Sequence, residues 1–302
     1  MPPHLSRACA AAVLAALLAL PACKKKDDGP TPPGTAPPPD NAGPSAGSPR
    51  PEPKPKPGPR PKPGPQDDST VPGPPTGAPY FKAGAMQAGI ECRHKLRQMA
   101  LALASVVELH QGKLPVGIAD NTGRVGLSWR VAILPYIEPY AEHENLYKQF
   151  KLDEPWDGEH NKKLIAKMPA VYAVPRRGID TRGYTYFRSF TGPDAVMPPA
   201  TGKPGRVATG IQLPAALKDG APTTLLVADA TEPVIWTKPD ELPYDKSQPP
   251  PEVGGGIVED EVHMLFCDLS VRSFQTRRTA GVLGQLINIH DWVPVDLNKL
   301  PR

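Results

Sequence analysis

The side chains that could do chemistry in this chain are few and scattered. Of its four tryptophans, Trp156 and Trp236 stand in polar stretches beside carboxylates and prolines. Aromatic rings in such surroundings can stack on sugars or peptides, so these two are the candidate ligand contacts. The alternative is that both rings fill the edges of a small core. The seven histidines include no pair in the context of a metal site, and we expect neither a metal nor a cofactor.

No residue has the surroundings of a catalytic nucleophile. The G-x-S-x-G pattern of serine hydrolases is absent from the sequence. Cys92 and His94 are two residues apart in a stretch with helical periodicity, so they face away from each other. The glycines at 254–256 follow a proline-rich stretch rather than a strand that opens into a helix, so no phosphate loop is predicted. We expect a protein that is not an enzyme.

The N-terminus predicts export and anchoring. Residues 8–20 form an apolar run of roughly 13 residues, too short to span a bilayer but suited to a secretory signal. The run ends in Leu20–Pro21–Ala22–Cys23, which resembles the lipobox of bacterial lipoproteins. The resemblance implies cleavage before Cys23, acylation of its sulfur and a stable anchor in a membrane of the cell envelope, either the outer membrane or at the periplasmic face. The alternative is an ordinary signal peptide with Cys23 as a bystander.

Two further cysteines would remain in the exported protein. Cys9 leaves with the signal and Cys23 carries lipid, so Cys92 and Cys267 are left in a compartment that permits disulfides. They could form one bridge or remain two buried thiols. The sequence does not set the Cα separation that would decide between these alternatives.

A proline-rich linker separates the anchor from the rest of the chain. Residues 55–65 read Pro-Lys-Pro-Gly-Pro-Arg-Pro-Lys-Pro-Gly-Pro, and residues 29–79 have almost no large apolar side chains. Such a segment cannot bury enough apolar surface to fold, so we expect a disordered, extended spacer that reaches on the order of 150 Å. Its basic side chains could bind anionic wall polymer or lipid headgroups. The net charge of +4 is mild and predicts no nucleic-acid partner.

The remaining sequence predicts one α+β domain. The chain therefore divides into a signal peptide (1–22), a lipidated N-terminus with its linker (23–79) and a folded domain (80–302). Asp219 and Asp229 are predicted to lie in turns or at strand edges, and Asp268 in a hairpin turn. Periodicity predicts a long helix at 82–110 that ends at Gly112, short helices at 145–150, 160–168 and 279–289, strands at 170–174, 184–190 and 223–229, and a hairpin at 262–274.

Several stretches of this domain carry a family resemblance. The chain resembles the planctomycete family known as DUF1559, which has the prepilin-type H-x9-DG processing-associated domain. The resemblance covers roughly residues 85–300 and implies a pseudopilin-like domain, with an N-terminal helix laid on an antiparallel sheet. The family has no established activity and has also been labelled a solute-binding group. The matching stretches are residues 92–102, 126–138, 144–157, 218–229, 236–244 and 268–272.

The sequence departs from the family pattern at informative places. A lipobox and a proline spacer stand where family members have a prepilin leader. The position ten residues before Asp268 is Val258 instead of His, and Leu269 follows where the motif has Gly. The family often has Cys-Pro where this chain has Val174–Pro175, so Cys267 is the only partner left for Cys92. We expect a non-enzymatic envelope lipoprotein that acts by protein or cell-wall contact; the alternative is a solute- or glycan-binding lipoprotein.

Overall fold

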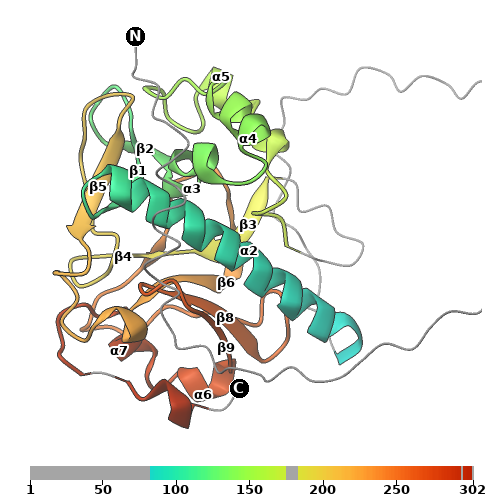
Figure 1. Ribbon diagram of the computed structural model, residues 1–302, viewed down its shortest axis with the longest axis vertical. Helices are drawn as coiled ribbons and strands as arrows, with labels where there is room; N and C mark the ends of the chain where they lie inside the picture. The colour runs from blue at the N-terminus through green and yellow to red at the C-terminus, as the bar shows by residue number, and fades with distance from the viewer. Residues whose placement is uncertain (1–81, 175–182, 294, 301–302) are drawn as a thin grey trace, which may run out of the picture. The chain divides into compact units, whose positions relative to one another are not determined.

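The computed structural model describes residues 82–174, 183–293 and 295–300. The signal peptide, Cys23 and the linker lie outside the described residues. The chain divides into two units, Met1–Gln66 and Asp67–Arg302, and every described residue belongs to the second. Within it, one long helix lies on antiparallel sheets, so the prediction of an α+β fold is confirmed (Figure 1).

The long helix α2 spans Lys82–Leu109, as its periodicity predicts. Buried side chains recur at three- and four-residue steps along one face of it, including Cys92, Leu96 and Met99. The helix ends because Gly112 adopts a φ of 87°, and its N–H donates to the carbonyl of Val107 at 2.8 Å. Among the described residues, no helix is both long and apolar enough to cross a membrane.

A four-stranded antiparallel sheet lies beneath α2, in the order β3-β6-β8-β9 (Figure 1). Adjacent residues on β8 face opposite sides: Leu265 belongs to the core cluster shared with α2, and Phe266 to a second cluster with Leu283 and Leu286 of α7. The elements are β3 (Tyr184–Arg188), β6 (Leu225–Ile235), β8 (Glu261–Phe266), β9 (Val271–Gln275), α6 (Thr276–Thr279) and α7 (Leu283–Ile287).

A three-stranded antiparallel sheet, β2-β1-β5, lies against the C-terminal half of α2 (Figure 1). Its strands are β1 (Lys113–Ala119), β2 (Val125–Ser128) and β5 (Val207–Gln212). The parallel strands β4 (Phe190–Thr191) and β7 (Leu242–Pro243) form a separate two-stranded sheet. The short helices are α3 (Trp129–Ala132), α4 (Tyr140–Tyr147) and α5 (Glu159–Lys162), and the 3-10 turns are Leu134–Tyr136, Ile165–Lys167, Ala221–Thr223 and Leu297–Lys299.

The structure corrects the sequence predictions in three places. Residues 170–174 form a turn instead of a strand, in which the N–H of Tyr172 donates to the carbonyl of Pro169 at 3.0 Å. The predicted helix at 279–289 is shorter than expected, because α6 ends at Thr279 and α7 covers only Leu283–Ile287. Asp229 is buried inside β6 instead of lying in a turn at its edge.

Candidate functional site

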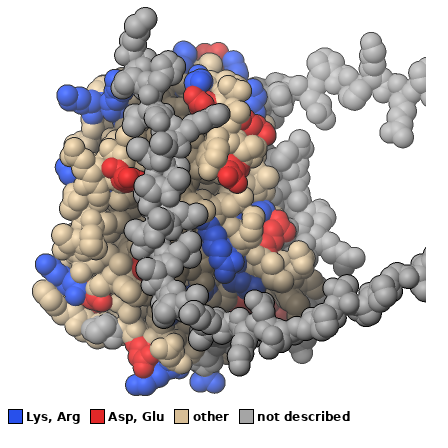
Figure 2. All heavy atoms as spheres, viewed as in Figure 1, with Lys and Arg blue, Asp and Glu red and all other residues tan. Residues whose placement is uncertain are grey.

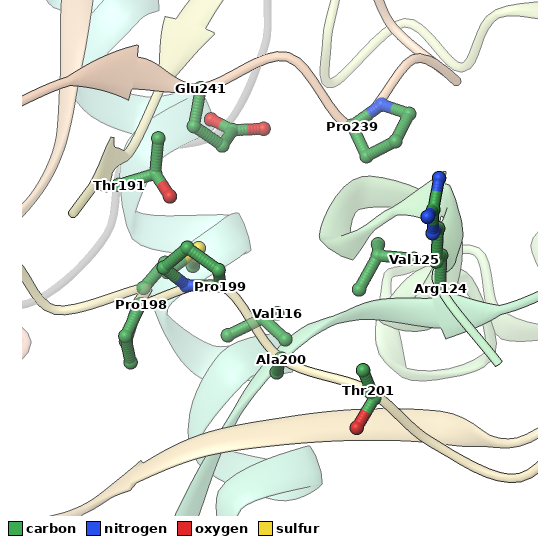
Figure 3. A pocket seen from close by; sticks show the side chains of 11 residues that line it. Val116, Arg124, Val125, Thr191, Pro198, Pro199, Ala200, Thr201, Pro239 and Glu241 are labelled. Atoms are coloured by element: carbon green, nitrogen blue, oxygen red, sulfur yellow. The ribbon is translucent and has the colours of Figure 1, made fainter. Parts of the chain in front are cut away.

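An apolar pocket of about 490 Å³ lies between the three-stranded sheet β2-β1-β5 and two loops that come from distant parts of the chain (Figure 3). Its floor and walls are aliphatic side chains and proline rings, with a few polar groups around them. The apolar lining consists of Val116, Val125, Met197, Pro198, Pro199, Ala200 and Pro239; the polar lining consists of Arg124, Thr191, Thr201 and Glu241.

The turn between β1 and β2 places Arg124 at the pocket. The carboxylate of Asp120 accepts hydrogen bonds from the N–H of Thr122 at 2.8 Å and of Arg124 at 3.2 Å. The hydroxyl of Thr122 donates to the same oxygen at 2.6 Å, and this is the main reason that the pKa of Asp120 is lowered. A backbone bridge joins Arg124 to Thr201, so the turn and the loop carrying Thr201 are held together.

Close backbone packing supports the opposite wall. Gly210 of β5 has no side chain, and a Cβ there would lie 2.9 Å from Cγ1 of Val116 and 3.4 Å from Cδ of Pro198. Both of these residues line the pocket. A larger residue at position 210 would therefore push the wall into the cavity.

Glu241 lines the pocket, but its charge is neutralised from behind. Both of its oxygens face the buried guanidinium of Arg130, with Nη1–Oε1 at 2.9 Å and Nη2–Oε2 at 3.1 Å. The N–H of Ser189 also donates to Oε2, at 2.6 Å. Arg130 itself is held by the carbonyl of Phe187, which accepts from Nε at 2.9 Å, and by the hydroxyl of Ser128 at 3.2 Å.

Arg124 is the unneutralised charge of the pocket. Its side chain is exposed, and among the described residues its guanidinium forms neither an ion pair nor a hydrogen bond. Its charge contributes to the lowered pKa of Asp120, which lies on the same turn. Figure 3 places Arg124 on the opposite side of the cavity from Glu241 and Thr191. The pocket thus combines apolar walls with one available cation.

The tryptophans predicted as ligand contacts do not line this pocket. Trp236 is fully buried: its ring stacks on Tyr172 with centroids 5.7 Å apart, meets Phe150 edge-on at 5.8 Å, and its Nε1 donates to the carbonyl of Ile165 at 2.9 Å. The ligand prediction is therefore wrong for Trp236, whose ring is part of the core. Trp156 is half-buried beside the same core, with Nζ of Lys238 5.8 Å from its ring.

Cys92 and Cys267 are both free cysteines, so the predicted possibility of a disulfide between them is not realised in the structure. Cys92 lies on the buried face of α2, and Cys267 follows β8 and donates its N–H to the carbonyl of Thr224. Burial raises the pKa of both thiols. Within the part of the chain that the structure describes, no group of three or more His, Cys, Asp and Glu side chains could hold a metal ion.

A second charged cluster, beneath α2, was missed by the sequence analysis. His263 on β8 and Asp229 on β6 are fully buried, with Nδ1–Oδ2 at 3.6 Å, and Nε2 of His263 lies 3.4 Å from Glu261. Gly89 makes room for the imidazole, since a Cβ there would lie 3.1 Å from Nε2. The sequence does carry one sign of this cluster: Asp229 and His263 each stand inside a stretch that is otherwise mostly apolar.

The fold defines an α+β domain in which a helix covers antiparallel sheets. The chain belongs to the family described as Protein of unknown function (DUF1559), whose model matches residues 89–256. That match contains every residue of the pocket and ends before β8 and β9. No match was found among curated proteins or among solved structures.

Proposed function

We propose that this protein is a non-enzymatic lipoprotein of the cell envelope, which displays its DUF1559 domain on an extended spacer and acts by binding at the apolar pocket. The anchor would be lipid on Cys23, and the spacer the proline-rich residues 29–79. The binding partner would be an envelope protein or a wall polymer. No nucleic acid is involved.

The observation that carries this proposal is that the carboxylate of Glu241, which lines the pocket, is already fully hydrogen-bonded within the protein. Glu241 has both oxygens occupied by Arg130 and the N–H of Ser189, so it is poorly placed to act as an acid or a base. What the pocket offers instead is apolar surface, which favours association by removing that surface from water.

Membrane fractionation tests the anchor. Wild-type protein is expected in the membrane fraction, whereas Cys23→Ser should appear in the soluble fraction, because the thioether-linked lipid cannot form. A Cys23→Ser protein that still sediments with membranes would show that lipidation is not the anchor.

Affinity capture from native envelope tests the binding site. The Cys23→Ser chain is compared with the same chain carrying Ala200→Trp, which fills the pocket. We expect the filled variant to lose the captured partners, and a matched change outside the pocket, Leu101→Trp on the exposed face of α2, to retain them. Equal capture by all three chains contradicts binding at the pocket.

Solute binding is the second candidate function, and the cavity volume favours it. Pockets of about 300–1,000 Å³ suit small ligands, and this cavity lies in that range. A glycan has less support, because none of the pocket's lining residues is aromatic and could stack on a sugar ring.

A further inference from the structure

We propose that the pocket binds the C-terminal end of an apolar polypeptide, with the terminal carboxylate against Arg124 and the preceding side chains against the proline walls. This inference rests on the proposed function, since it names the ligand of the same pocket. It follows from three features of the lining: its charge, its apolar walls and its continuation into a second cavity.

The charge of the pocket selects an anion. Arg124 is exposed and has no ion-pair partner among the described residues, while Glu241 is already neutralised by the buried Arg130. Among the residues that line the first cavity, the charge left without an ion-pair partner is therefore positive, and the carboxylate of Asp120 on the same turn partly offsets it. A guanidinium presents two parallel N–H groups that match the two oxygens of a carboxylate, so a chain terminus suits this position.

The apolar walls of the pocket favour an anion that is attached to an apolar group. Val116, Val125 and Pro198 present hydrocarbon to the cavity, and these groups gain from being covered by other apolar groups. A free inorganic anion would leave this apolar surface exposed to water. Figure 2 shows Lys and Arg side chains interspersed with Asp and Glu over the visible part of the face viewed.

A second cavity favours a polypeptide over a fatty acid. A hollow of about 550 Å³ shares Thr191 and Pro199 with the pocket and continues along Pro243, Tyr244 and Gln248. Its lining is mainly apolar, and its polar side chains include the carboxylate of Asp245 and the amide of Gln248. The backbone N–H groups of a peptide can donate to these oxygens, whereas a hydrocarbon chain offers them no hydrogen bond.

The order of the lining residues gives the bound peptide a direction. Arg124 and Thr191 lie on opposite sides of the first cavity (Figure 3). A peptide with its carboxylate at Arg124 therefore crosses the apolar floor and leaves past Thr191 toward the second cavity. The hydroxyl of Thr191 forms no hydrogen bond with another described residue and is available to a backbone amide at this crossing.

Isothermal titration of the full mature chain with Cys23→Ser tests the proposal. The probe is the hexapeptide acetyl-Ala-Pro-Val-Ala-Leu-Val with a free carboxylate, and its matched control is the same peptide with a C-terminal amide. We expect the acid to bind and the amide to bind at least about tenfold more weakly. The amide cannot form the charge-assisted, bidentate hydrogen bond with the guanidinium.

Two variants assign that difference to the pocket. Arg124→Gln should lower the affinity for the acid peptide to that for the amide peptide, and the affinity for the amide peptide should not change. Arg97→Gln, a matched change on the exposed face of α2, should alter neither affinity. Ala200→Trp should abolish binding of both peptides, with an unchanged circular dichroism spectrum to show that the variant folds.

The proposal is overturned by no binding of the acid at millimolar concentration, by equal affinity of acid and amide, or by an Arg124→Gln chain that still discriminates between them. Decanoate that binds through Arg124 while the hexapeptide does not also overturns it, since the occupant would then be a fatty acid. If the peptide fails but Ala200→Trp still loses envelope partners, the proposed function stands without this inference.

Discussion

The guanidinium of Arg130 and the carboxylate of Glu241 lie face to face, 111 residues apart in the sequence, with two parallel N–O contacts of 2.9 and 3.1 Å. Neither side chain has appreciable contact with solvent, with exposed fractions of 0% and 8%. This pair joins α3 to the segment before β7, and its carboxylate, Glu241, lines the pocket.

Glu241→Gln should destabilise the domain strongly. The change leaves the buried cation of Arg130 without its counter-charge, which costs about 3–5 kcal/mol in the free energy of unfolding. Urea denaturation followed by circular dichroism measures this loss. The matched control is Asp240→Asn: Asp240 is 43% exposed beside Arg188 and Lys238, so its loss should cost about 1 kcal/mol or less. Equal effects of the two changes would contradict the buried ion pair.

Stability should also depend on the protonation of His263. Burial lowers the pKa of His263, but attraction to Asp229 and Glu261 outweighs burial and the repulsion from Arg93, so the net direction is upward. A raised folded-state pKa means that protonated His263 stabilises the fold fully below its unfolded pKa of about 6.5. That contribution is lost as pH rises through the folded pKa.

The free energy of unfolding should therefore fall between pH 6 and pH 9 more steeply in the wild type than in His263→Gln. The comparison is needed because Cys92 and Cys267, with raised pKa values, also reduce stability at the alkaline end. His94→Gln, on the exposed face of α2, should keep the wild-type slope. If His263→Gln keeps that slope as well, the cluster beneath α2 is not protonated in the folded state.

Thiol counting distinguishes two free cysteines from a bridge. In the chain that starts at residue 23 with Cys23→Ser, we expect slow reaction of the native protein with a thiol reagent, because Cys92 is buried, Cys267 is half-buried and the pKa values of both thiols are raised. After denaturation in the absence of reductant, two thiols per chain should react. A count of zero would establish a disulfide.

Local patterns were sufficient to predict α2 and the β8–β9 hairpin. The helix has a regular apolar stripe and a glycine at its end, and Asp268 accepts from the N–H of Ser270 at 2.9 Å in the hairpin turn, as predicted. By contrast, β1 was missed because it contains Pro115 and Gly117, which are both unusual inside strands. Gly117 is required there, since a Cβ would lie 2.4 Å from the carbonyl oxygen of Leu127.

The candidate site could not be predicted from local patterns, because it is assembled by long-range pairing. Arg124 lies before β2 and is bridged to Thr201, which precedes β5, and Arg130 of α3 meets Glu241, which precedes β7. Trp236 stands in a polar stretch of sequence, yet the fold encloses its ring. Sequence neighbours alone therefore gave the wrong environment for it.

Trp292 lies beside a pair of carboxyl groups, those of Asp219 and Asp291. Its ring is 68% exposed, its φ is 59°, and its N–H donates to Asp219 at 3.1 Å. Burial and the neighbouring Asp291 raise the pKa of Asp219 to about 6, although the N–H of Trp292 and the charge of His290 oppose the shift. Lys218 covers the ring with Nζ 5.3 Å from its centroid. The surroundings of the indole should therefore change as this pair releases its proton.

The emission of Trp292, obtained as the difference between the wild type and Trp292→Phe, should titrate with a midpoint near pH 6. Asp291→Asn removes the carboxylate that repels the charge on Asp219, so the midpoint should move down toward the ordinary value of about 4. Asp296→Asn, a change in the same C-terminal segment, leaves the pair intact and should leave the midpoint unchanged. A midpoint near 6 that persists in Asp291→Asn would mean that burial alone raises the pKa of Asp219, and that the two carboxyl groups do not share a proton.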